Sequence, residues 1–107
     1  MIIAIVDITP KEERMAEFKS WISDSNKVLS KFDGFVSRRL LEGEDGSKRI
    51  VVEFENMDQF RKMHQSPEHT KFHSELGSFM QKPPQRQFFH IIAEWYDTSM
   101  LGLTEIE

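Results

Sequence analysis

The chain has 107 residues, of which 38% are hydrophobic and 30% charged, and its formal net charge is −4. This length favours one domain with one modest core. The absence of cysteine excludes disulfides, thiolate catalysis and cysteine-based zinc sites, and it fits a reducing cytoplasm, where we expect the protein to reside. No long run of one charge sign indicates nucleic-acid binding.

The first third of the chain predicts a strand and then a helix. Residues 2–8 (IIAIVDI) are rich in β-branched residues, and polar residues follow at once, which favours a strand over a signal peptide or a membrane span. Thr9 is expected to cap the next helix, with Pro10 at its first position and Glu12 at the capping-box distance. One helix face is then marked at helical spacing by Met15, Phe18, Ile22 and Leu29. Gly34 is expected to take a left-handed conformation near the end of this helix.

The remainder predicts a hairpin, two helices and a last strand. Residues 35–42 and 48–55 flank the turn sequence GEDG and read as paired strands. Asn56 is expected to cap a short helix that carries Met57, Phe60 and Met63. Ser66, followed by proline and glutamate, begins a second helix that runs to about Met80. The last predicted strand spans residues 87–95.

This order defines an α+β, ferredoxin-like β-α-β-β-α-β fold, in which both main helices cover one face of the sheet. The other face is expected to be apolar, because the first strand is apolar on both sides and the last strand adds Phe89, Ile91, Ala93 and Trp95. An exposed apolar surface of this size predicts association. We therefore expect a homodimer, in which the sheet of an identical subunit covers this face about a two-fold axis.

Two segments resemble the antibiotic biosynthesis monooxygenase (ABM) family of the dimeric α+β barrel superfamily. The first, DGFVSRRLLEGEDGSKRIVVEFENMDQF, combines a Gly-Phe entry to the hairpin with a short helix. The second, SPEHTKFHSEL, is a helix start followed by a further histidine. The resemblance covers residues 1–95 and implies a ligand pocket within each subunit, between the helices and the sheet. The family contains cofactor-independent monooxygenases, quinol monooxygenases, haem-degrading monooxygenases and members that are not oxygenases.

A cofactor-independent oxygenase needs an apolar pocket and a group that removes a proton from the substrate. His73 is the candidate catalytic residue, and His69, four residues earlier, flanks the same apolar stripe of Phe72, Leu76, Phe79 and Met80. The positive end of the helix dipole favours a neutral His69. The expected substrate-binding residues are Phe54, Phe60, Met63, His69, Phe72 and His90, with Phe88, Phe89 and Trp95 as further candidate walls.

Three alternatives remain open at this stage. In haem-degrading relatives a histidine on this helix binds the iron, a tryptophan lies ten residues earlier, and an asparagine lies on the first strand. In this sequence His73 stands at the position of the histidine. Met63 stands at the position of the tryptophan, and Ala4 or a close neighbour stands at that of the asparagine. A metal could use the pair of His69 and His73 with a third ligand from Glu68, His64 or His90. Each of these histidines could instead be structural, and the protein could be a non-catalytic or stress-related binding dimer.

The expected function is thus a monooxygenase (oxidoreductase) that acts on a small aromatic or quinol-like substrate, with no cofactor in the favoured interpretation and haem in the alternative. Its expected partners are a second copy of the chain and the small-molecule substrate, with neither nucleic acid nor membrane. Arg38 and Arg39 could bind an anionic substrate, but we expect them to pair with Glu42, Glu53 or Glu55. Residues 96–107 form a tail that is expected to pack on the dimer partner through Met100, Leu101, Leu103 and Ile106.

Overall fold

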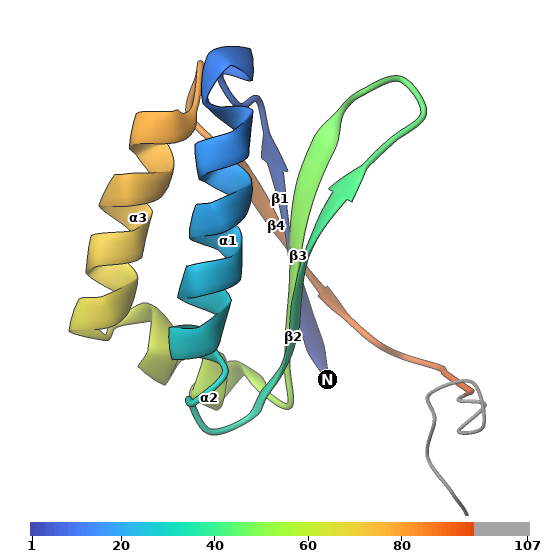
Figure 1. Ribbon diagram of the computed structural model, residues 1–107. Coiled ribbons are helices and arrows are strands. Elements are labelled where there is room, and N and C mark those ends of the chain that lie inside the picture. Colours follow the sequence, from blue (N-terminus) through green and yellow to red (C-terminus); the bar gives the residue numbers. More distant parts are fainter. Residues whose placement is uncertain (96–107) are drawn as a thin grey trace, which may run out of the picture.

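The computed structural model describes residues 1–95, so the expected packing of the tail lies outside the described residues. Within this range four antiparallel strands form one sheet in the order β2-β3-β1-β4. Their bounds are β1 (Ile2–Ile8), β2 (Phe35–Glu42), β3 (Lys48–Phe54) and β4 (Gln85–His90). The helices are α1 (Met15–Leu29), α2 (Met57–His64) and α3 (Pro67–Phe79). The predicted α+β ferredoxin-like fold is confirmed. Figure 1 shows α1 and α3 side by side over one face of the sheet.

The helix-facing side of the sheet supplies the core. Ile2, Ala4 and Ile8 of β1 point toward the helices, and their partners on β3 are Phe54, Val52 and Lys48. One core cluster joins β1 and β3 to α2, and a second joins them to α1 and the end of α3. Phe18, Ile22 and Leu29 of α1 are buried, as their helical spacing predicts. The two clusters therefore occupy opposite ends of one helix–sheet layer.

The predicted helix starts are partly correct. Asn56 caps α2, where its Oδ1 accepts from the Gln59 N–H at 2.9 Å, and Ser66 caps α3, where its Oγ accepts from the His69 N–H at 3.1 Å. The predicted cap at Thr9 is wrong. The backbone around Pro10 pairs with Met80 instead, and a 3₁₀ turn, η1 (Glu12–Arg14), precedes α1. Pairing with the segment after α3 thus replaces the expected first turn.

Two turns use glycine as the sequence predicts. Gly34 has φ +83°, in the left-handed region, where the chain leaves α1 for β2. A side chain there would also collide with Gln59 of α2. Gly46 has φ +86° in the hairpin turn between β2 and β3.

The hairpin itself matches the predicted strands within one residue, whereas β4 begins two residues earlier and ends five residues earlier than predicted. None of the helices in residues 1–95 is long and apolar enough to cross a membrane.

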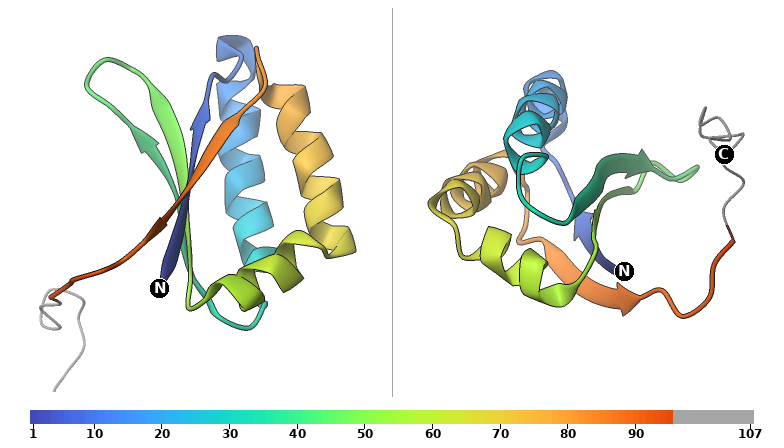
Figure 2. Two further views of the ribbon diagram at one scale, coloured as in Figure 1. Left: turned by 180° about the vertical axis from the view of Figure 1, so that it is seen from behind. Right: turned by 90° about the horizontal axis from the view of Figure 1, so that it is seen from below.

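The face of the sheet opposite the helices is mixed rather than uniformly apolar. Its centre carries Ile3, Ile5 and Val51, where β1 pairs with β3, and Phe89 lies opposite Ile3 on β4. An ion pair of Asp7 with Arg49, at 2.7 Å, lies at one end of this face. Within residues 1–95 no helix covers it, as the views in Figure 2 show. Residues 91–95 lie beyond β4, so they do not extend the apolar face as a strand.

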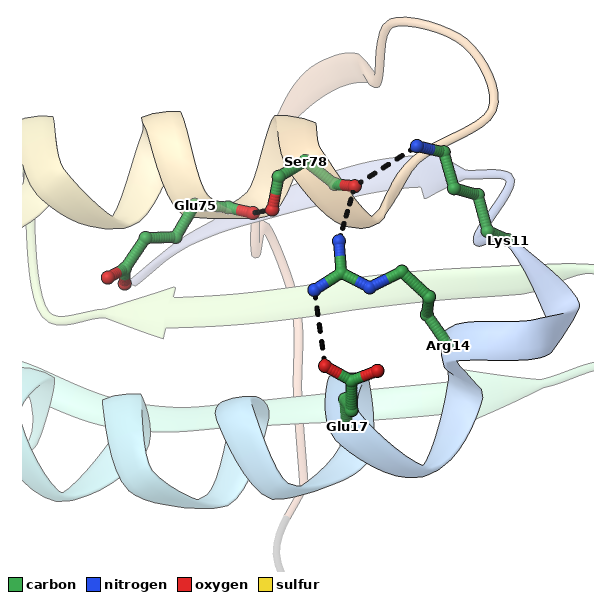
Figure 3. A network of polar contacts seen from close by, with 5 residues as sticks. All are labelled: Lys11, Arg14, Glu17, Glu75 and Ser78. Atoms are coloured by element: carbon green, nitrogen blue, oxygen red, sulfur yellow. Dashed lines mark hydrogen bonds and ion pairs between the residues drawn. The ribbon is translucent and has the colours of Figure 1, made fainter.

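The upper ends of α1 and α3 are joined by a polar network (Figure 3). The backbone carbonyl of Ser78 accepts from Arg14 Nη1 at 2.8 Å and from Lys11 Nζ at 3.3 Å. The Arg14 guanidinium also lies 4.3 Å from the centre of the Phe79 ring. Two cations thus bind the carbonyl end of α3, where the helix dipole is negative. This network fixes the last turn of α3 against the start of α1.

Candidate functional site

A cavity of about 80 Å³ lies between the helices and the helix-facing side of the sheet, where the ABM resemblance implies a pocket. It is found where the two core clusters meet, and Val52 packs against both of them. The sheet provides its floor and the helices its roof. The apolar lining residues are Ala4, Val6, Leu29, Ile50, Val52, Phe60, Met63, Phe72 and Leu76.

Four polar side chains complete the cavity wall: Arg38, His69, His73 and Arg86. His73 on α3 and Arg86 on β4 are both exposed, so the cavity reaches solvent between these two elements. The Arg86 guanidinium lies 4.8 Å from the Phe88 ring centre. His69 and Arg38 are partly buried and lie deeper in the wall. Within the described chain, no aspartate or glutamate lines the cavity.

The structure brings together most of the residues that the sequence singles out. Phe60, Met63, His69, Phe72 and His73 all line the cavity. Two others do not. Phe54 is fully buried in the core, packed edge to face against Phe35 and Phe60. His90 is exposed at the end of β4, opposite Ile2, because the strand ends there.

The other aromatic residues that were expected to line the pocket also lie outside the cavity. Phe88 lies on the helix-facing side and packs edge to face on Phe60, with ring centres 5.2 Å apart, but it stands outside the lining. Phe89 faces the opposite side of the sheet because neighbouring strand residues alternate. Trp95 is 88% exposed beyond β4. The predicted aromatic pocket is therefore smaller and built mainly from α2 and α3.

Arg38 is the main residue whose role was assigned incorrectly. It pairs with none of Glu42, Glu53 or Glu55. Its Nη1 donates to Ser25 Oγ at 2.6 Å and to Asn26 Oδ1 at 3.0 Å, both on α1. The strand register explains this, since Arg38 shares its side of β2 with Leu40, whose partner Ile50 is buried in the core. Burial lowers the pKa of Arg38 to about 10, so it keeps its charge at neutral pH.

Three histidines lie in a row along α2 and α3. The ring centres of His64 and His69 are 4.3 Å apart, and those of His69 and His73 are 6.2 Å apart. Burial, followed by the nearby charges of His64 and His73, lowers the pKa of His69 to about 4. Burial also lowers the pKa of His64. His69 is therefore neutral at pH 7, and its ring can accept a hydrogen bond. Among residues 1–95 its ring has no hydrogen-bond partner.

Neither a metal nor haem fits this arrangement. In the described part of the chain, no three His, Asp or Glu side chains converge closely enough to hold a metal ion. The cavity is also smaller than the roughly 150 Å³ apolar cavity that admits benzene in another protein. At this volume neither a porphyrin nor a substituted aromatic ring fits without movement of lining residues. Phe72 is partly exposed, and His73 and Arg86 at the mouth are exposed.

The sequence matches the model of the antibiotic biosynthesis monooxygenase family over residues 1–75. Because this match covers more than half of the chain, the protein belongs to that family. No curated protein matches the sequence.

Solved structures share the fold at low sequence identity. The chain is similar to SnoaB, a cofactor-independent oxygenase from Streptomyces nogalater, with a TM-score of 0.77 and 18% identity over 90% of this chain and 97% of SnoaB. Rv0793 from Mycobacterium tuberculosis gives a TM-score of 0.75 and 15% identity over 87% of this chain and 96% of the other. A conserved protein from Methanosarcina mazei Go1 gives 0.73 and 13%, covering 83% and 91%.

Proposed function

We propose that the protein is a cofactor-independent monooxygenase that oxidises a small phenol or hydroquinone in the cavity beneath α3. The observation that carries this proposal is His69, a neutral imidazole in an otherwise largely apolar wall, with no hydrogen-bond partner among the described residues. A group in this state can accept a hydrogen bond from a bound hydroxyl and orient it for reaction. The family and the likeness to SnoaB support the reaction class.

The residues divide the proposed work between them. His69 accepts a hydrogen bond from the substrate hydroxyl and orients it. When the proton leaves through the mouth of the cavity, the phenolate that remains makes the ring an electron donor. Phe60 and Phe72 hold the ring against the floor of the sheet. His73, at the mouth, is the second candidate catalytic residue, because it lies within one helical turn of His69 and can pass the proton to water.

The proposed reaction balances without an added reductant. The phenolate gives electrons to O₂, and a carbon–oxygen bond forms at a ring carbon that carries hydrogen, opposite the hydroxyl of a phenol or beside a hydroxyl of a hydroquinone. The resulting hydroperoxide loses water as its O–O bond breaks, so one oxygen atom stays on the ring as a quinone carbonyl and the other leaves as water. The apolar wall favours this chemistry because it excludes water from the anion and from O₂.

Oxygen uptake with a panel of phenols and hydroquinones tests this function. With ¹⁸O₂ we expect a quinone that carries one labelled oxygen atom, without release of hydrogen peroxide. Unlabelled quinone with hydrogen peroxide would indicate a simple oxidase and contradict the proposal. An absence of turnover with every compound would favour the non-catalytic binding protein, and a Soret band on addition of haem, lost in His73→Ala, would favour the haem protein.

The proposed working unit is a homodimer. The open face of the sheet supports this, because Ile3, Ile5 and Val51 form an apolar centre with Phe89 beside it. Phe89 is 45% exposed in the single chain. Burial of such a surface against an identical sheet would stabilise two chains about a two-fold axis. The helix side of each subunit, and with it the cavity, would stay free.

A further inference from the structure

Arg38 is held in one position in the cavity wall by neutral groups alone. It lies on β2 opposite Val52, on the helix-facing side of the sheet. One of its nitrogen atoms, Nη1, donates to both Ser25 Oγ and Asn26 Oδ1. Its guanidinium carbon lies 5.2 Å from the Trp21 ring centre, within the range of a cation–π contact. These contacts fix the guanidinium, but none of them supplies a full negative charge.

The acidic residues of the hairpin are engaged elsewhere. Glu42 pairs with Lys48 at 2.9 Å. Glu53 lies on the opposite face of the sheet, where it accepts from Ser37 at 3.4 Å. Within residues 1–95 Arg38 forms no ion pair, and its Nε and Nη2 atoms donate no hydrogen bond to the protein. A charge removed from water without a partner is costly, so a bound anion would stabilise this site.

The rest of the wall has the same electrostatic character. Arg86 stands at the mouth, and within the described residues no carboxylate faces the cavity. All other lining residues are apolar. A guanidinium with two unused donor groups matches the geometry of a carboxylate or of a phenolate oxygen. A neutral, fully apolar ligand would leave these donors unpaired.

We propose that Arg38 determines substrate specificity by binding an anionic oxygen group, a carboxylate or a phenolate, on an aromatic ring that rests against Phe60 and Phe72. This inference rests on the proposed function only in placing the substrate in this cavity. Arg38 then sets which compounds bind, and His69 acts on the hydroxyl that is oxidised.

The test measures binding in the absence of oxygen, so that it does not depend on turnover. Isothermal titration compares 2,5-dihydroxybenzoate with its methyl ester, and 4-nitrophenol above and below its own pKa, which separates the carboxylate from the phenolate. We expect the anionic member of at least one pair to bind the wild type about 10-fold or more tightly, as a charge-assisted hydrogen bond would provide.

Arg38→Met should abolish this preference, because it keeps the apolar stem and removes the charge. The matched control is Arg61→Met on α2, whose arginine is exposed, pairs with Asp58 and lies outside the cavity. It should keep the preference. The urea midpoint of Arg38→Met should fall modestly, because the bonds of Arg38 to Ser25 and Asn26 are lost, so binding is compared without urea, where both proteins are folded.

Equal binding of both members of each pair, or an unchanged preference in Arg38→Met, would overturn the inference. The anion-site inference and the proposed function can fail separately. Arg38-dependent binding without oxygen uptake would reject the monooxygenase and keep the anion site. Oxygen uptake by the wild type with equal binding of both members of each pair would keep the monooxygenase and reject the anion site.

Discussion

The imidazole of His69 makes stability depend on pH in a definite direction. Its pKa is about 4 in the folded chain, below the ordinary value of 6.5, mainly because burial disfavours the charged form. As pH falls through 6.5 the unfolded chain binds a proton that the folded chain refuses until about pH 4. This residue therefore removes stability between pH 6.5 and about 4. Urea midpoints across this range should fall more steeply for the wild type than for His69→Asn, and parallel curves would contradict the assignment.

The same side chain should carry the activity. His69→Asn replaces the imidazole that orients the substrate hydroxyl with an amide whose oxygen lies elsewhere, so kcat should fall about 100-fold or more. His90→Asn is the matched control, because that histidine is exposed at the end of β4 and lies outside the cavity. Stopped-flow oxygen consumption measures both. A similar loss in the two variants, or none in His69→Asn, would remove His69 from the mechanism.

At the level of single residues, the sequence distinguished pocket residues from core residues poorly. Helical spacing predicts His69 and His73 on one side of α3, and both line the cavity. The sequence could not show that Phe54 belongs to the core. The alternation of strand residues tells which face of the sheet a phenylalanine occupies, but a core position and a pocket position lie on the same face. Arg38 could have been found from its register with Leu40 on β2. The sequence does not show that α1 presents Ser25 and Asn26 to it.

At the level of elements, the pairing of α1 with α3 sets the roof of the cavity. Arg14→Met removes the bond to the Ser78 carbonyl and the charge near Phe79 (Figure 3). We expect a loss of about 1 kcal/mol in the free energy of unfolding. Amide exchange should also become faster in the last turn of α3.

Lys27→Met is the control for this variant, since Lys27 has a side chain that is 77% exposed and forms only a long pair with Asp24. Exposed pairs of this kind contribute little. Equal urea midpoints for Arg14→Met and the wild type would show that the network at the helix ends is not needed to hold α3.

The helix starts show where local signals succeed and where they fail. Thr-Pro-Lys-Glu and Ser-Pro-Glu-His look alike in the sequence, yet only Ser66 caps a helix. Near Thr9 the backbone pairs with the segment after α3, where the Thr9 carbonyl accepts from the Gln81 N–H at 2.8 Å, and this long-range pairing overrides the local preference. The hairpin and α2 were predicted well because their turns and caps depend on neighbours in the chain.

At the level of the whole molecule, the proposed dimer depends on the centre of the open sheet face. Ile5→Lys places a charge there, opposite Val51, and should give monomers. The same substitution at Thr70, on the outer surface of α3, should leave the dimer intact. Sedimentation velocity at micromolar concentration distinguishes these states. A wild-type protein that sediments as a single chain would contradict the dimer.

The fold and the position of the cavity followed from the order of strands and helices and from the family resemblance. The size of the cavity and its positive wall did not, because they depend on how side chains of the two core clusters pack around Val52 and on the register of Arg38 and Arg86. The central claim, that this space receives the substrate, is tested most directly by a crystal structure of the protein soaked with 2,5-dihydroxybenzoate without oxygen. We expect the ring between Phe60 and Phe72, with an oxygen atom of the anion on Arg38. A ring bound elsewhere, with the cavity still closed in an enzyme that turns over, would contradict the account.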